Sequence, residues 1–142
     1  MKSEMETKVR ELLSLFHQQN IDFARIAGFF SADAHYQAHV PGVEPLIGRE
    51  TIRAELERQL KLYNECDFHI LNLACNDRQL FAERRDQVTQ NGVRVEVRVN
   101  AIFEFNDQGE IQSWREYWDM GSVQQQLGIS AREMSGYMEQ SS

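Results

Sequence analysis

The sequence predicts an α+β fold in which helices near the amino terminus cover one face of a curved antiparallel sheet, shaped as a cone-like roll. Three observations support this prediction. Apolar residues follow a helical period over much of the first third of the chain. From residue 68 onward they alternate with polar residues, as in half-buried strands. Turn residues separate the alternating runs, which indicates neighbouring strands joined by short connections.

Three helices are predicted in the first half of the chain. The first is indicated by apolar residues that return to one face at helical spacing, namely Met5, Val9, Leu12, Leu13 and Phe16. The second is indicated by Phe23, Ile26, Ala27, Phe29 and Phe30, and the stretch Ser31–Asp33 ends it. Gly48 opens the third helix, which carries Ile52, Leu56 and Leu60 on one face.

The predicted strands fill most of the remaining chain. The first, Ala34–Val40, ends at a Pro41-Gly42 break that is followed by a loop through Pro45. The later strands are Phe68–Cys75, Leu80–Thr89, Val93–Phe105 and Ile111–Met120. Asn91-Gly92 and Asp107-Gln108-Gly109 supply turns for an antiparallel meander. A short helix over Ala131–Met138 lies in a tail, about residues 129–142, whose tip we expect to be mobile.

Length and composition exclude several classes of protein. A chain of 142 residues predicts a single domain, 1–142. Its net charge of -7 disfavours nucleic acid as a partner. The two cysteines, Cys66 and Cys75, form no disulfide framework and have no metal-ligand spacing, which favours a reducing cytoplasm. No apolar run is long enough to span a membrane, so we expect no membrane association.

Two charged residues fall on the face of a strand that should be apolar. In the run Leu80–Thr89, Arg84 and Asp86 share the face of Leu80, Ala82 and Val88. Burying a charge is costly unless it is paired and hydrogen-bonded, so Arg84 and Asp86 predict further polar partners inside the cone. Two interpretations stay open at this point: an ion pair that fixes strand register, or part of a functional site.

The neighbouring strands offer such partners. In the last strand Glu116 lies between Trp114 and Trp118 on one face, whereas Asp119 lies on the other. In the first strand Tyr36 and Ala38 share a face opposite His35, Gln37 and His39. If these faces point inward, one Tyr, one Arg and two carboxylates share an apolar cavity. Two carboxylates around one cation should titrate as a coupled pair with one pKa raised, which provides an acid and a base.

The remaining candidates concern the walls of the cavity and the surface. Trp114 and Trp118 are expected to line the pocket. His39 is a further pocket candidate, since a bulge would turn it inward beside Ala38; otherwise it lies at the strand edge. The four histidines have no mutual metal spacing, so no metal site is expected. The acidic residues Glu50, Glu55 and Glu57, with Arg53 and Arg58, indicate a solvated helix face.

Several motifs resemble the limonene-1,2-epoxide hydrolase family. That family belongs to the nuclear transport factor 2-like superfamily, which also includes ketosteroid isomerases and SnoaL-like polyketide cyclases. The resemblance covers most of the chain and rests on Tyr36-Gln37, Gly48-Arg49, the run Glu83-Arg84-Arg85-Asp86 and the run from Trp114 to Asp119. It implies a nuclear transport factor 2-like fold. The loop from Pro41 to Ile47 is longer than that of the epoxide hydrolase family, and its run His39-Val40-Pro41-Gly42 resembles SnoaL-like proteins.

The resemblance also implies roles for individual residues. Asp86 matches the acid that protonates the epoxide oxygen, Arg84 the residue that bridges the carboxylates, Glu116 the base, and Tyr36 one ligand of the attacking water. Two positions depart from the family pattern. Ala38 stands where the family has a water-binding Asn, and Glu116 stands where the family has an Asp. Both departures affect the water rather than the acid.

The sequence therefore predicts a cofactor-independent enzyme that opens a small apolar or cyclic epoxide to a diol by one-step attack of water. The alternatives are an isomerase or cyclase of the ketosteroid isomerase or SnoaL-like kind, and a non-catalytic small-molecule-binding module. We expect a small apolar substrate and no cofactor. The apolar row Val93, Val95, Val97 and Val99 also suggests a homodimer formed through the sheet.

Overall fold

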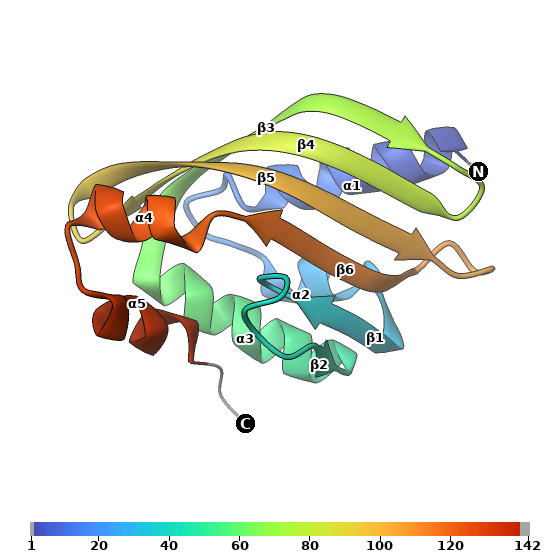
Figure 1. The fold of residues 1–142 in the computed structure, drawn as a ribbon. Coiled ribbons are helices and arrows are strands. Elements are labelled where there is room, and N and C mark those ends of the chain that lie inside the picture. Colours follow the sequence, from blue (N-terminus) through green and yellow to red (C-terminus); the bar gives the residue numbers. More distant parts are fainter. Residues whose placement is uncertain (1, 140–142) are drawn as a thin grey trace.

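The computed structural model describes residues 2–139, which form a curved sheet covered on one face by helices (Figure 1). In this part of the chain the sheet has six strands in the order β2-β1-β6-β5-β4-β3. The strands are β1 (Phe30–Gln37), β2 (Leu46–Ile47), β3 (Tyr63–Cys75), β4 (Gln79–Gln90), β5 (Val93–Phe105) and β6 (Ile111–Trp118). The helices are α1 (Lys2–Leu15), α2 (Phe23–Ala27), α3 (Arg49–Leu62), α4 (Met120–Leu127) and α5 (Ala131–Met138).

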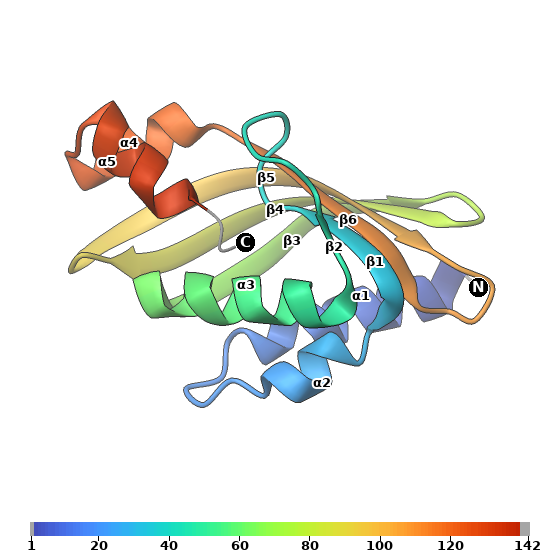
Figure 2. The same cartoon turned by 90° about the horizontal axis from the view of Figure 1, so that it is seen from below.

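The helices divide into two groups around the sheet. Helices α1, α2 and α3 lie beneath its concave face, and α4 and α5 lie together at one end of it (Figure 2). The core fills the space between α1, α3 and the concave face, where Met5, Leu12, Ile52, Leu56 and Phe103 are almost fully buried. The predicted α+β class and the covering by amino-terminal helices are confirmed.

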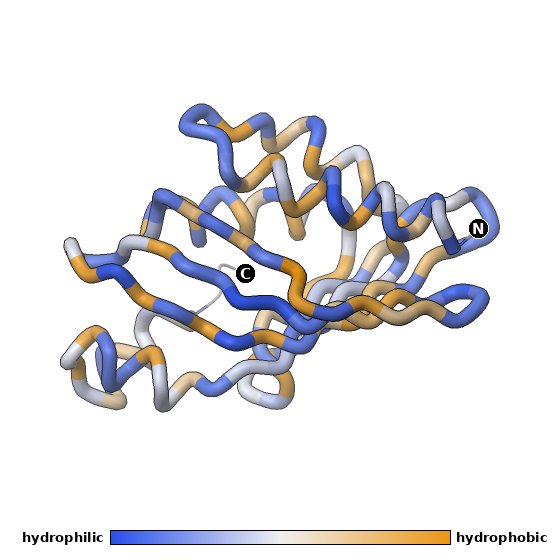
Figure 3. The backbone as a smooth tube through the Cα atoms, turned by 90° about the horizontal axis from the view of Figure 1, so that it is seen from above, coloured by the Kyte–Doolittle hydropathy of each residue, from blue (hydrophilic) through white to orange (hydrophobic). Residues whose placement is uncertain are grey.

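The alternation of strand β4 is the feature that positions the site. Its inward residues Leu80, Ala82, Arg84, Asp86, Val88 and Gln90 are all buried. The residues between them are more exposed, so hydropathy alternates along the strands when the outer face of the sheet is viewed (Figure 3). Asn91 and Gly92, both with positive φ, make the two-residue turn that joins Gln90 to Val93. The predicted inner face of this strand is confirmed.

The second predicted helix is too long at its carboxyl end. Helix α2 stops at Ala27, and β1 begins at Phe30 rather than at Ala34. The cause is a tertiary contact, because the Phe29 carbonyl accepts a hydrogen bond from Ile111 N–H at 2.9 Å and Phe30 stacks on Trp114. Strand β1 also runs parallel to β6, whereas the other pairs in the described chain are antiparallel.

Other boundaries differ because side chains cap helices or because a strand bulges. Strand β3 begins at Tyr63, where α3 passes directly into extended backbone. Strand β6 ends at Trp118 because Asp119 caps an unpredicted helix, α4, by accepting from Ser122 N–H. A bulge in β6 opposite Glu104 and Phe105 turns the Gln112 side chain to solvent. The side chains of β6 therefore follow the predicted inward alternation only from Trp114 onward.

The carboxyl-terminal helix forms over Ala131–Met138, as predicted. It begins with a capping box in which Ser130 and Glu133 bond each other's backbone N–H groups. The tip of the tail, residues 140–142, lies outside the described residues, so its mobility stays a prediction. No helix in residues 2–139 is both long and apolar enough to cross a membrane.

The valine row of β5 faces the interior of the cone. Val95 and Val99 are buried, and both line the cavity together with Val97. Val95, Val97 and Val99 are therefore unavailable for an interface on the outer face of the sheet, whereas Val93 is half-buried and is not among the lining residues. The homodimer itself stays a prediction.

Candidate active site

Arg84 is a buried cation that bridges two carboxylates inside the cone. Its guanidinium donates to both oxygens of Asp86, from Nε at 3.0 Å and from Nη2 at 2.7 Å. Its Nη1 donates to Glu116 Oε2 at 2.5 Å. Arg84 is only 1% exposed, and its guanidinium lies 5.6 Å from the centre of the Phe68 ring. The three charged side chains that the sequence indicated are therefore brought together, from β4 and β6.

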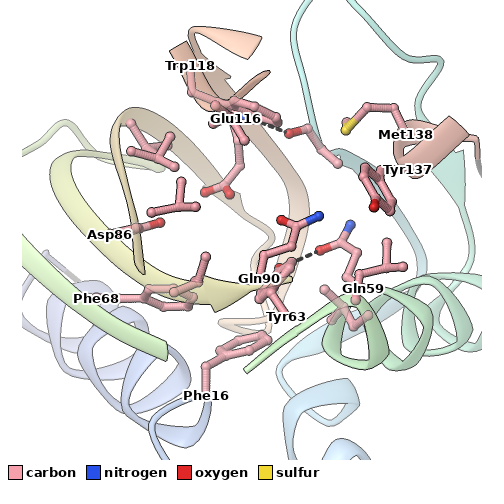
Figure 4. Close-up of a pocket in the computed structure, with 18 of the residues that line it drawn as sticks. Phe16, Gln59, Tyr63, Phe68, Asp86, Gln90, Glu116, Trp118, Tyr137 and Met138 are labelled. Carbon is pink, nitrogen blue, oxygen red and sulfur yellow. Dashed lines mark hydrogen bonds between the residues drawn. The ribbon is translucent and has the colours of Figure 1, made fainter. Parts of the chain in front are cut away.

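The two carboxylates differ in their surroundings. Asp86 is held at both oxygens by Arg84, whereas Glu116 uses Oε2 for both Arg84 and the Trp114 indole N–H at 3.0 Å. No group of residues 2–139 hydrogen-bonds to Glu116 Oε1. The carboxylates of Asp86 and Glu116 both point toward the pocket (Figure 4). Glu116 thus retains an oxygen that can accept a further hydrogen bond.

Burial controls the protonation of this cluster. Burial raises the pKa of Asp86, the charge and hydrogen bonds of Arg84 oppose that rise, and the charge of Glu116 adds to it, so the net shift is upward. For Arg84, burial acts to lower the pKa, but the charges and hydrogen bonds of Glu116 and Asp86 raise it overall, which keeps the guanidinium charged. Asp86 therefore holds a proton more readily than an exposed aspartate does, beside a permanent cation.

Tyr36 brings a hydroxyl into the same cavity, as predicted. It is 2% exposed, and its ring lies 4.9 Å from that of Trp114. Its hydroxyl is 3.2 Å from Gln59 Nε2, which donates to it. Burial, followed by the charge of Glu116, raises the pKa of Tyr36 far above its ordinary value, so the hydroxyl keeps its proton. Gln59 fixes the position of that hydroxyl from helix α3.

A second buried polar network on α3 was missed by the sequence analysis. Glu55 is 3% exposed and accepts two hydrogen bonds from Arg58, at 2.8 and 2.9 Å, and one from Gln59 at 3.0 Å. Tyr63 donates to Gln59 Oε1 at 3.2 Å. The prediction that Glu55 lies on a solvated face is wrong. Its position on the apolar stripe, three residues after Ile52, was the signal that could have located it.

The cavity between the sheet, α3 and α5 has a volume of about 140 Å³. Trp114, Trp118 and Ala38 line it, as predicted, together with the site residues described above. Phe16 and Phe68 close its floor, and Met134, Tyr137 and Met138 of α5 contribute to the opposite wall (Figure 4). Gln90 also lines it, although its predicted strand ended one residue earlier. The walls are mostly apolar, with polar groups at a few defined points.

His39 does not line this cavity, so its placement in the pocket is wrong. Its Nδ1 accepts from Gly42 N–H at 3.1 Å, and its Nε2 lies 3.0 Å from the Trp118 carbonyl oxygen. The ring also packs edge-on against the Trp118 ring at 4.6 Å. Both nitrogens are therefore used to attach the loop after β1 to the end of β6, and no ring nitrogen turns toward Ala38.

The described residues contain no group of three or more His, Cys, Asp or Glu side chains arranged to hold a metal ion. Arg84, Asp86 and Glu116 form one charged cluster in a mostly apolar pocket. Side chains of these kinds are the ones that general acid–base chemistry uses. The fold and this site define a small-molecule-binding protein of the nuclear transport factor 2-like class.

The model of the SnoaL-like domain matches residues 9–114, and the chain belongs to this family. Among solved structures it is similar to an LEH-like epoxide hydrolase from M. tuberculosis, with a TM-score of 0.74 and 23% identity over 88% of this chain and 90% of that one. This likeness and the two that follow are below 25% identity and support the fold alone. A search of the curated proteins finds no match.

Two further structures have nearly the same likeness. One is SalBIII, an epoxide hydrolase/cyclase-like enzyme of pyran ring formation in the polyether salinomycin, with a TM-score of 0.73 and 19% identity over 85% of this chain and 95% of that one. The other is a hypothetical protein with a ketosteroid isomerase-like fold from Catenulispora acidiphila, in complex with trimethylamine, with a TM-score of 0.73 and 18% identity over 86% and 95%. The fold is thus shared by proteins with different chemistry.

Proposed function

We propose that this protein is a cofactor-independent epoxide hydrolase that opens a small epoxide by direct attack of water. The observation that carries the proposal is the bridge that Arg84 makes between Asp86 and Glu116 inside an apolar cavity. Epoxide opening needs a proton donor for the leaving oxygen and a base for the attacking water. One cation between two carboxylates provides both groups near neutral pH.

The roles follow from the surroundings of each carboxylate. Asp86, whose pKa burial raises, donates its proton to the epoxide oxygen as the carbon–oxygen bond breaks. Glu116 accepts a proton from water through Oε1 as the water oxygen bonds to the epoxide carbon. The product is a diol, and a proton returns from Glu116 to Asp86 before the next cycle. Arg84 stays charged throughout and stabilises whichever carboxylate is ionised.

Tyr36 helps to position the attacking water. Its hydroxyl keeps its proton and is oriented by Gln59, which bonds in turn to Glu55. Ala38 contributes no hydrogen bond to the water, so Tyr36 and Glu116 must hold it between them. Gln59 thus connects the Tyr36 hydroxyl to Glu55, and these hydrogen bonds hold the hydroxyl in place relative to helix α3.

The test is hydrolysis of a panel of cyclic, terpene and styrene-type epoxides in oxygen-18 water. Under single-turnover conditions the wild type should place solvent oxygen in the diol, because no ester to the enzyme forms. Asp86→Asn should lower kcat by about 10²–10⁴-fold. Glu83→Gln, a matched change on the outer face of the same strand, should leave the rate unchanged. Near-wild-type rates for Asp86→Asn would exclude the assigned acid.

A second candidate is favoured by Ala38, which offers no polar side chain to an attacking water. A hydroxyl group of the substrate itself could then open the epoxide and form a ring, with Glu116 taking the hydroxyl proton and Asp86 protonating the epoxide oxygen. Formation of a cyclic ether without solvent label from a hydroxy-epoxide distinguishes this reaction from hydrolysis. Proton abstraction beside a carbonyl is favoured less, because that reaction needs one carboxylate base and no cation that bridges two carboxylates.

A further inference from the structure

Gln90 is a buried amide with no hydrogen-bond partner among residues 2–139. It is 7% exposed and lines the cavity. The other buried polar side chains in the described chain, Ser31, Glu55, Arg84 and Asp86, all have partners. Among the described residues, Arg85 Nε is the only fully buried side-chain nitrogen or oxygen without a partner, so the unpaired amide of Gln90 is accessible from the cavity. At the wall of a cavity, a ligand can supply the missing hydrogen bond.

Gln90 lies on the inner face of β4, further along the strand than the charged cluster. It is four residues beyond Asp86 on the same face of β4, which separates the two Cα atoms by about 13 Å. In Figure 4 the amide of Gln90 lies between the carboxylates of Asp86 and Glu116 and the side chains of Gln59 and Tyr137. The apolar side chains of Val88 and Val95 line the cavity near Gln90. A ligand that reaches both Gln90 and the charged cluster needs an apolar middle.

The surroundings of Gln90 select a neutral partner. Arg58, the lining cation outside the charged cluster, is held bidentately by Glu55 and also donates to the Tyr137 carbonyl oxygen at 3.0 Å. Neither charge of this pair is left to bind an ion. A primary amide both donates and accepts, so a hydroxyl group satisfies it better than an ether or a charged group does.

We propose that Gln90 binds a hydroxyl group of the substrate, so that the enzyme acts on an apolar epoxide that carries a hydroxyl at its far end. For the epoxide end of the substrate this inference rests on the proposed function, and for the hydroxyl end it rests on Gln90 alone. The cavity of about 140 Å³ limits the buried part to about the size of benzene, which fits an apolar cavity of about 150 Å³. A linear C6 hydroxy-epoxide carries the two polar groups at opposite ends of an apolar chain.

The experiment compares 5,6-epoxyhexan-1-ol with 1,2-epoxyhexane, which differ only in the terminal hydroxyl. For the wild type we expect kcat/KM to favour the hydroxy-epoxide about tenfold, from one hydrogen bond to a buried amide. Gln90→Met, which keeps the length of the side chain, should abolish that preference, so that kcat/KM becomes equal for the two epoxides within about twofold. Gln87→Met on the outer face of β4 is the matched control and should keep the preference. An unchanged preference in Gln90→Met overturns the proposal.

A binding experiment separates this inference from the proposed hydrolysis. The side-chain amide resonances of Gln90, identified by their loss in Gln90→Met, are followed by NMR during titration with hexane-1,2-diol and hexane-1,2,6-triol. The triol should shift them and the diol should not. If neither epoxide is turned over but the triol shifts the resonances, the hydroxyl site stands and epoxide hydrolysis fails. If the triol shifts the Gln90 amide resonances no more than the diol does, or if the triol does not bind, the hydroxyl site is refuted. This conclusion holds whether or not the epoxides are turned over.

Discussion

Replacing Arg84 by Met should destabilise the protein strongly, because it leaves two buried carboxylates without their cation. The methionine keeps most of the apolar stem but removes contacts of 2.5 Å to Glu116 and 2.7 Å to Asp86, and the stacking on Phe68. Removing one partner of a buried ion pair costs about 3–5 kcal/mol. Since a domain of this kind is stable by about 5–15 kcal/mol, the change should be evident as a large shift of the urea midpoint.

The stability lost in Arg84→Met should increase as pH rises. Burial raises the pKa of Asp86 in the folded protein, so the folded state binds this proton more tightly than the unfolded state does. Stability from this group is present at low pH and is lost as pH rises through the folded pKa. Arg84→Met removes the charge that opposes the rise, so the pKa increases further. The stability difference from wild type should therefore be largest at about pH 8 and shrink toward about pH 5.

The control is Arg98→Met on the outer face of β5. The Arg98 side chain is 61% exposed and lies 3.7 Å from Glu83, so its loss should change the free energy of unfolding by no more than about 0.5 kcal/mol at any pH. Urea denaturation of the three proteins between about pH 5 and 8 makes the comparison. If Arg84→Met matches Arg98→Met at high pH, or gains stability as pH rises, the description of a buried, proton-retaining cluster is wrong.

Four further outcomes are expected. Glu55→Gln should cost about 1.5–3 kcal/mol in urea denaturation, since it weakens a buried charged pair with Arg58. His39→Ala should cost about 1 kcal/mol and leave kcat for epoxide opening within about twofold, because the ring holds a loop and not the substrate. Gly48→Ala should cost about 1–3 kcal/mol, since Gly48 has φ of 106° and ψ of 136°. The kcat/KM for epoxide hydrolysis should fall as pH rises through the raised pKa of Asp86, and a fall only toward acid would contradict its role as the acid.

The charged part of the site could be predicted because strand periodicity decides which residues point inward. Arg84 and Asp86 share the inner face of β4 with buried Ala82 and Val88, so the direction of their side chains follows from the sequence alone. That Glu116 meets them depends on β5, which pairs with both β4 and β6 and brings the two strands into the same sheet. A meander with recognisable turns makes such neighbours predictable.

The polar residues of α3 and the end of β4 were not predicted, for a different reason. Glu55 and Gln59 lie on the same stripe as Ile52 and Leu56, but a charged residue on a helix with several salt-bridge partners also fits a solvated face. Only the cavity above the helix decides between the two. Gln90 continues the inward alternation of β4, so it could have been found by extending the strand by one residue.

Helix α4 was also not predicted, although the sequence contains residues typical of both helix ends. Asp119 is its N-cap, and Gly128 is its C-cap in a left-handed conformation.

The two departures from the limonene-1,2-epoxide hydrolase pattern, Ala38 and Glu116, are neighbours in the structure. Tyr36 pairs with Trp114 and Gln37 with Arg115, and Val40 N–H donates to the Glu116 carbonyl oxygen at 2.9 Å, which sets Ala38 beside Glu116. A short side chain beside a long one conserves volume in a packed interior. The extra methylene lets the Glu116 carboxylate reach Arg84 and the Trp114 indole with one oxygen and still extend the other into the cavity. In the proposed mechanism this pair replaces an amide ligand of the water by a base with a longer reach, so that Glu116 and Tyr36 hold the water.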